Sequence, residues 1–195
     1  MERLGNYLRQ NLPELQTLVE NKLNVKLGKI EIKPIPCCVN DIADYMAKKE
    51  EFSPAVMRVA TALVRIAIFL TEDGYFLRGS GMIAKAGPST IYYSRSPLAL
   101  YGLTDSDMMA TELHELTHIA HAKLADITLM EKPPKYTEAF AEYVAMKIME
   151  EKGKTVPESS YAKELFKFRL ELDKKKLKTI DQVIQFVLEQ KQETY

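Results

Sequence analysis

The chain has few of the residues on which secreted and nucleic-acid-binding proteins depend. Its 195 residues include only two cysteines, the neighbours Cys37 and Cys38, which cannot form the disulfide framework of a small secreted domain. Basic and acidic residues both number 27, so the basic excess typical of nucleic-acid binding is absent. We therefore expect a reducing, cytoplasmic compartment and no nucleic-acid partner.

The sequence also shows no segment typical of membrane insertion. The first fifteen residues contain no apolar run of the kind found in a signal peptide. The most apolar stretch, Ser53–Leu70, contains Arg58 and Arg65, which lie seven residues apart on one face of a helix. This pattern favours a largely buried amphipathic helix over a transmembrane span.

The length fits one domain over residues 1–195, with an N-terminal segment at about 1–52, a core at 53–153 and a C-terminal helical segment at 154–195. Periodicity and caps predict helices at 3–23, 39–51, 53–70, 104–125, 135–152 and 179–191, and strands at 25–35, 75–86 and 90–95. Because strands and helices are segregated along the chain, we predict the α+β class.

The most informative pattern is His114-Glu115-Leu116-Thr117-His118, which reads HExxH within a predicted helix. Histidines four apart on a helix differ by about 40° in direction and about 6 Å in rise, so both rings can reach one metal ion. Glu115 is rotated by about 100° from His114, which lets its carboxylate face a water molecule on the metal. These residues suit metal-assisted hydrolysis with zinc.

A catalytic zinc usually has three protein ligands and one open position. The chain has only three histidines, all between residues 114 and 121. His121 would lie about 10 Å along the helix axis from His114, and we interpret it as a surface or cleft-wall histidine.

The better third ligand lies on the next predicted helix, in the sequence TEAFAEYVA. Glu138 and Glu142 share one face, and Ala141 and Ala145 would let the two helices approach closely. A helix–turn–helix return would bring Glu138 to His114 and His118, and Glu142 could accept the free N–H of one histidine. The alternative is that both glutamates are ordinary solvated helix charges.

HELTH followed by TEAFAE resembles the gluzincins, zinc peptidases that combine HExxH with a glutamate on a following helix. The resemblance covers about residues 91–152 and is closest in size to minimal gluzincins. It departs at Glu142, where the family usually has Asp, and at Thr137, where Asn is common.

This resemblance implies a zincin-like fold with a small, mostly antiparallel sheet, a backing helix at 53–70, and an edge strand at 90–94 that binds an extended substrate. Ile91, Tyr92 and Tyr93 are then the expected substrate-binding residues.

The expected function is zinc-dependent hydrolysis of a peptide or protein substrate, with Glu115 as general base and His114, His118 and Glu138 as ligands. A further donor usually stabilises the oxyanion; the candidates are Tyr101, Tyr136, Tyr143 and Tyr161. The apolar helices also leave room for a homodimer.

Two other functions remain open. The protein could be a latent or non-catalytic zincin, with its cleft covered by the C-terminal helices or its metal capped by Cys37 or Cys38; truncation near residue 155 would then release activity. Alternatively, it could be a zinc hydrolase that acts on a non-peptide amide.

Overall fold

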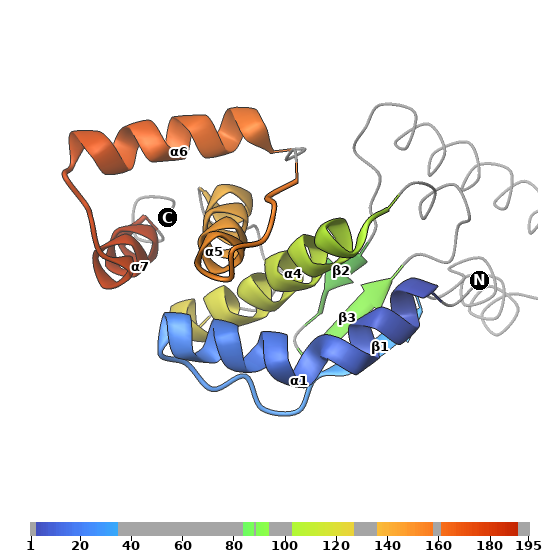
Figure 1. The fold of residues 1–195 in the computed structure, drawn as a ribbon. Helices are drawn as coiled ribbons and strands as arrows, with labels where there is room; N and C mark the ends of the chain where they lie inside the picture. Colours follow the sequence, from blue (N-terminus) through green and yellow to red (C-terminus); the bar gives the residue numbers. More distant parts are fainter. Residues whose placement is uncertain are drawn as a thin grey trace, which may run out of the picture.

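The computed structural model of the chain describes residues 3–34, 84–87, 89–93, 103–126, 136–157 and 161–190. Within these ranges the protein is mostly helical, with five helices and one small sheet (Figure 1). The elements are α1 (Arg3–Leu23), β1 (Glu31–Pro34), β2 (Ala84–Ala86), β3 (Thr90–Tyr93), α4 (Asp105–Ala125), α5 (Thr137–Glu151), α6 (Ala162–Lys174) and α7 (Ile180–Glu189). The helices predicted at 39–51 and 53–70, the latter as the backing helix, lie outside the described residues.

Helix α4 is the central element and contains the HExxH sequence. It begins with the predicted capping box: the amide of Asp107 donates to the Thr104 hydroxyl, and the Asp107 carboxylate accepts from the Thr104 amide. Every residue from 112 to 122 is buried, because α1 packs on one side of α4 and α5 on another (Figure 1). The polar residues of HExxH are therefore held inside the protein.

Helices α1 and α5 match the sequence prediction closely. Helix α1 has the predicted bounds and buries an apolar stripe formed by Leu4, Leu8, Leu15, Val19 and Leu23. Helix α5 ends just before Gly153, whose φ of +64° is the left-handed conformation typical of a helix C-terminus. Ala141 and Ala145 are buried, so small side chains lie where α5 packs against α4.

The sheet has the order β1-β3-β2. Strand β1 pairs with β3 in parallel, with Glu31 opposite Thr90, whereas β2 pairs with β3 antiparallel, with Ala86 opposite Ile91. The sheet is therefore mixed, and the expectation of a mostly antiparallel sheet is wrong. Strand β1 is also shorter than the predicted strand at 25–35.

The predicted position of the edge strand is wrong as well. Strand β3 is paired on both sides, and it buries Ile91 and Tyr93 in the core. The Tyr93 hydroxyl accepts a hydrogen bond from Arg9 of α1 at 3.2 Å. Among the described strands, β2 is the edge strand that contacts α4.

Four aromatic residues attach the C-terminal helices to α5. Phe168 of α6 lies 5.3 Å from Tyr136, 5.8 Å from Tyr143 and 6.3 Å from Phe186 of α7, between ring centroids. Helix α7 begins after a capping box, in which the Thr179 hydroxyl accepts from the Gln182 amide. We call Tyr136, Tyr143, Phe168 and Phe186 the aromatic cluster.

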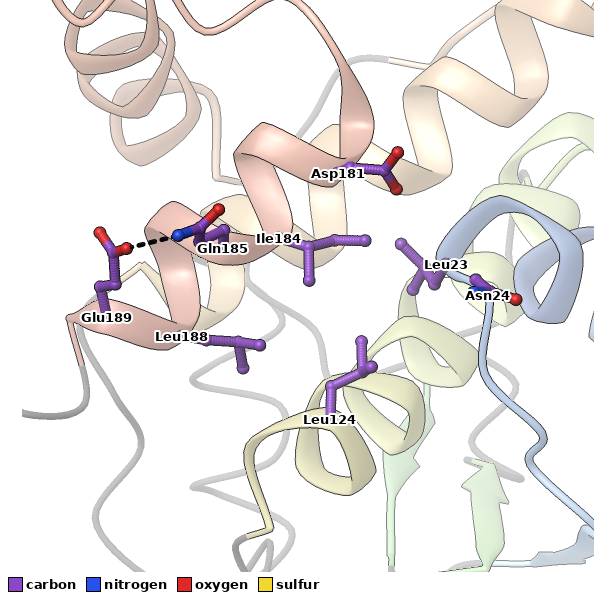
Figure 2. Close-up of a pocket in the computed structure, with 8 residues that line it drawn as sticks. All are labelled: Leu23, Asn24, Leu124, Asp181, Ile184, Gln185, Leu188 and Glu189. Carbon is purple, nitrogen blue, oxygen red and sulfur yellow. Dashed lines mark hydrogen bonds between the residues drawn. The ribbon is translucent and has the colours of Figure 1, made fainter.

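A shallow groove of about 450 Å³ lies where α1, α4 and α7 come together (Figure 2). Its apolar floor consists of Leu23, Leu124, Ile184 and Leu188. None of the HExxH residues lines this groove. No helix among the described residues has the length and apolar character needed to span a membrane.

Candidate metal centre

Two imidazoles of α4 and one carboxylate of α5 converge on a single point. The Nε2 atoms of His114 and His118 are 3.0 Å apart, and each lies 3.2 Å from Oε2 of Glu138. Within the described residues this is the one group of three that could hold a metal ion. The three predicted ligands, including the one from the second helix, therefore lie together.

The spacing of these three atoms fits a small divalent cation. Bonds of about 2.0–2.1 Å in a tetrahedral site place neighbouring ligand atoms about 3.3 Å apart. The observed separations of 3.0–3.2 Å require the side chains to move outward by only a few tenths of an ångström. Two imidazoles with a carboxylate also form the nitrogen and oxygen donor set that zinc accepts in catalytic sites.

The site is buried at the histidines and open at the glutamate. The residues His114 and His118 are each 8% exposed, whereas the side chain of Glu138 is 45% exposed. An ion at this point would have protein on the α4 side and access from the side of Glu138. Such a site can hold a metal and still admit a further ligand.

Glu142 holds the ring of His114 from the other side. Its Oε2 lies 3.0 Å from Nδ1 of His114, one helical turn beyond Glu138. A carboxylate at Nδ1 keeps that nitrogen protonated and directs Nε2 toward the metal position. The sequence left open which histidine Glu142 would contact, and the contact is with His114.

The charges of the metal-free site compensate one another. Burial lowers the pKa of His114, but hydrogen bonds to Glu138 and Glu142 outweigh it and raise the pKa to about 10. Burial raises the pKa of Glu138, but the hydrogen bonds to His114 and His118 outweigh it and hold the pKa well below its usual range. The metal-free triad therefore stabilises a positive charge next to the Glu138 carboxylate. A bound metal ion would supply the same charge.

Glu115 is buried beside the triad, between α4 and β2. Burial raises its pKa, whereas the nearby imidazoles of His114 and His118 and a hydrogen bond from the backbone of Ala86 lower it. The net effect of these influences is a raised pKa of Glu115. A buried carboxyl group with a raised pKa is more readily protonated than an exposed one, as a group that accepts and returns a proton must be.

One of the four candidate tyrosines lies against the triad. The ring of Tyr161 stacks on His114 with centroids 5.4 Å apart and planes 12° apart, and its hydroxyl hydrogen-bonds to Glu138. Burial, together with the negative charges of Glu138 and Glu115, raises the pKa of Tyr161 well above its usual range. Tyr136 and Tyr143 belong to the aromatic cluster, and Tyr101 lies outside the described residues.

The remaining predicted site residues lie elsewhere. His121 is 2% exposed, with its ring edge-on to Phe140 at 5.2 Å between centroids, so its interpretation as a surface histidine is wrong. Ile91 and Tyr93 are core residues of a central strand, and Tyr92 is partly buried. Cys37 and Cys38 lie outside the described residues.

No pattern in the sequence selects Ala86 or favours Tyr161 over the other tyrosines. Ala86 contacts Glu115 through its backbone, which no side-chain pattern reveals. Comparisons with protein-family models, with curated proteins and with solved structures found no match to this chain.

Proposed function

We propose that the protein is a zinc-dependent peptidase of the gluzincin type. The observation that carries the proposal is the convergence of His114, His118 and Glu138 within 3.2 Å of one another, beside the buried carboxyl of Glu115. A metal triad with an adjacent carboxylic acid is the minimum needed for metal-assisted hydrolysis of an amide.

In this mechanism His114, His118 and Glu138 would hold the zinc ion, which when bound would supply Lewis-acid activation of water and of the scissile carbonyl. Glu115 takes the proton of the attacking water and then delivers it to the leaving amine. The burial that raises the pKa of Glu115 makes its protonated form accessible, so the same carboxyl can serve both steps. Glu142 fixes the tautomer of His114 through Nδ1.

We propose that an extended peptide binds along the outer edge of β2, in place of the edge first expected at β3. The Gly87 amide donates to the Thr90 carbonyl at 2.6 Å, so these two residues form a hydrogen-bonded pair across the strands. Such pairs alternate with non-bonded pairs in an antiparallel ladder. Ala86, opposite Ile91, therefore directs its N–H and C=O away from β3.

Two observations support this position for the substrate. The outward amide of Ala86 donates to Glu115, so the edge of β2 that no described strand covers faces the proposed general base. A peptide paired with this edge would pass close to the metal triad, with its main chain held by hydrogen bonds and its side chains alternating in direction.

A metal site without catalytic activity is the second candidate. It is favoured by Tyr161, which stacks on His114 and hydrogen-bonds to Glu138, and so occupies part of the space beside the triad. Such a protein would bind zinc and leave peptides intact.

The Glu115→Gln variant tests the proposed chemistry. We expect it to keep a stoichiometric zinc ion and to lose about 10²–10⁴-fold in turnover, because the amide cannot accept the water proton. The measurements are metal content by mass spectrometry and cleavage of a peptide library by the purified protein. Glu150→Gln, an exposed glutamate of α5 paired with Lys147, is the matched control.

The outcomes separate the candidates. Wild-type protein that binds zinc and cleaves no peptide favours the non-catalytic site. Undiminished cleavage by Glu115→Gln would exclude the proposed mechanism.

A further inference from the structure

Tyr161 connects the C-terminal helices to the metal triad. It is the residue immediately before α6, and α6 is attached to α5 through the aromatic cluster. The two helices that provide the ligands, α4 and α5, are therefore joined at the triad by a residue from a third element. Nothing in the ligand set itself requires this contact.

The contacts of Tyr161 reach two different ligands. Its ring covers one face of His114, with nearly parallel planes, and its hydroxyl hydrogen-bonds to the carboxylate of Glu138. His114 is also in edge contact with His118, with centroids 4.6 Å apart, and its Nδ1 is held by Glu142. Tyr161 completes the set of contacts that prevent the ring of His114 from rotating.

Glu138 is the ligand that most needs support. It lies in the first turn of α5, and its side chain is 45% exposed, so it has the most rotamer freedom of the three ligands. Freedom that remains in the metal-free protein must be lost when the metal binds, which weakens binding. The Tyr161 hydroxyl donates to the Glu138 carboxylate and restricts it before the metal binds. Less conformational freedom then remains to be lost on binding.

We propose that Tyr161 is a positioning residue of the metal centre, which holds His114 and Glu138 in the orientation that binds the ion. Helices α6 and α7 then contribute to the metal centre, because their packing holds Tyr161 beside the triad. This inference rests on the proposed function only in requiring that the triad binds a divalent cation. It is independent of whether the protein cleaves peptides.

A C-terminal segment that positions the ligands and one that only blocks the site have opposite effects on zinc affinity. A blocking residue would compete with an incoming ligand, and its removal would leave zinc affinity unchanged or higher. A positioning residue stabilises the ligand arrangement, and its removal lowers zinc affinity. Partners that orient metal ligands typically contribute 10–100-fold in affinity.

The test compares zinc dissociation constants of full-length variants, measured by competition with a chromophoric chelator. We expect Tyr161→Phe, which keeps the ring stacked on His114, to bind zinc about 10-fold more weakly than the wild type. Tyr161→Ala, which loses both contacts, should bind more weakly still. The matched control is Tyr143→Phe, which removes a tyrosine hydroxyl from the aromatic cluster and should bind zinc like the wild type.

A second readout separates positioning from a general loss of stability. The visible absorption of the Co²⁺-loaded protein reports ligand geometry, and we expect its bands to shift in Tyr161→Phe and not in Tyr143→Phe. The melting temperature of metal-free Tyr161→Phe should match that of the control.

Equal or tighter zinc binding by both Tyr161→Phe and Tyr161→Ala would overturn this inference and leave the metal site standing. A wild-type protein that binds neither Zn²⁺ nor Co²⁺ would overturn both this inference and the proposed function. Loss of affinity in Tyr161→Ala alone would assign the effect to the ring, and the proposed role of the hydroxyl would be wrong.

Discussion

The two sides of α4 bury similar carboxyl groups in opposite surroundings. On the side toward α1, Glu112 is 0% exposed, and neither of its carboxylate oxygens has a hydrogen-bond partner among the described residues. Its charge contributes to the raised pKa of Tyr7 on α1. On the side toward α5 and β2, Glu115 lies among two imidazoles and a backbone donor. Burial raises the pKa of both glutamates, and within the part of the chain that the structure describes only Glu115 has groups that moderate the effect.

This difference shows what distinguishes a site from a buried polar residue. Desolvation alone raises the pKa of Glu112 to about 9, and no group of metal-ligating side chains among the described residues includes it. The triad side combines donors, acceptors and a point where a cation fits. A site is therefore recognised by several side chains that converge on one point. Burial alone does not identify it.

The largest expected effect comes from removing a ligand on the triad side. We expect His118→Ala to weaken zinc binding by at least about 10³-fold, because two ligands remain and a buried donor position is empty. Metal content after dialysis against zinc buffers measures this. His121→Leu, which changes a buried histidine of the same helix that faces Phe140, should retain the ion. Loss of zinc in both variants would contradict the assignment of the triad.

The next effect concerns the α1 side and depends on pH. The pKa of Glu112 in the folded protein, about 9, lies above the value of 4.5 for a free glutamate. Ionisation of Glu112 therefore adds no cost below pH 4.5, and its cost to stability grows as the pH rises toward 9. We expect Glu112→Gln to raise the free energy of unfolding by about 2–4 kcal/mol at pH 8 and to have little effect at pH 4.5.

Urea denaturation of metal-free protein across this pH range measures the difference. Parallel pH profiles for the wild type and Glu112→Gln would show that a positive charge outside the described residues compensates Glu112. The two sides of α4 would then resemble each other more than their described residues indicate.

The smallest expected effect comes from weakening the contact of Glu142 with His114, which orients a ligand of the triad. We expect Glu142→Gln to weaken zinc binding by up to about 10-fold, because a neutral amide oxygen at Nδ1 of His114 orients the ring but supports less positive charge. Isothermal titration with Zn²⁺ measures this, with Glu150→Gln as the control on the same helix. An unchanged affinity would mean that the contact between Glu142 and His114 contributes nothing to the metal site.

The helices and the triad could be predicted from the sequence because their signals are local. The capping box at Thr104 and Asp107, the glycine after α5 and the cap at Thr179 all lie next to the elements they delimit. The distance between His118 and Glu138 is fixed by one helix–turn–helix unit. Short-range rules were sufficient for these features.

The sheet could not be predicted because its partners are distant in sequence. The β-branched and aromatic residues of TIYY indicate a strand, but not whether the strand has one neighbour or two. Parallel pairing of Glu31 with Thr90 leaves no local trace. The sequence therefore identified a substrate edge at Ile91, Tyr92 and Tyr93, whereas the described edge strand near the site is β2.

Burial of His121 and selection of Tyr161 were missed for related reasons. The polar composition of α4 gives no sign that residues 112–122 are enclosed on every side. Ten tyrosines compete for one position, and the one that lies at the triad is brought there by packing of α6 through the aromatic cluster. Packing of this kind depends on side-chain shape across three helices.

The short separation of His118 and Glu138, twenty residues, has a consequence for the order of assembly. Closing the α4–α5 unit costs less chain entropy than joining β1 to β3, where the loop is roughly three times longer, and the difference is about 1 kcal/mol. Early folding would thus bring together the atoms that capture the ion before β1 joins β3. A refolding chain is then expected to form its metal centre first and to add β1 to the sheet afterwards.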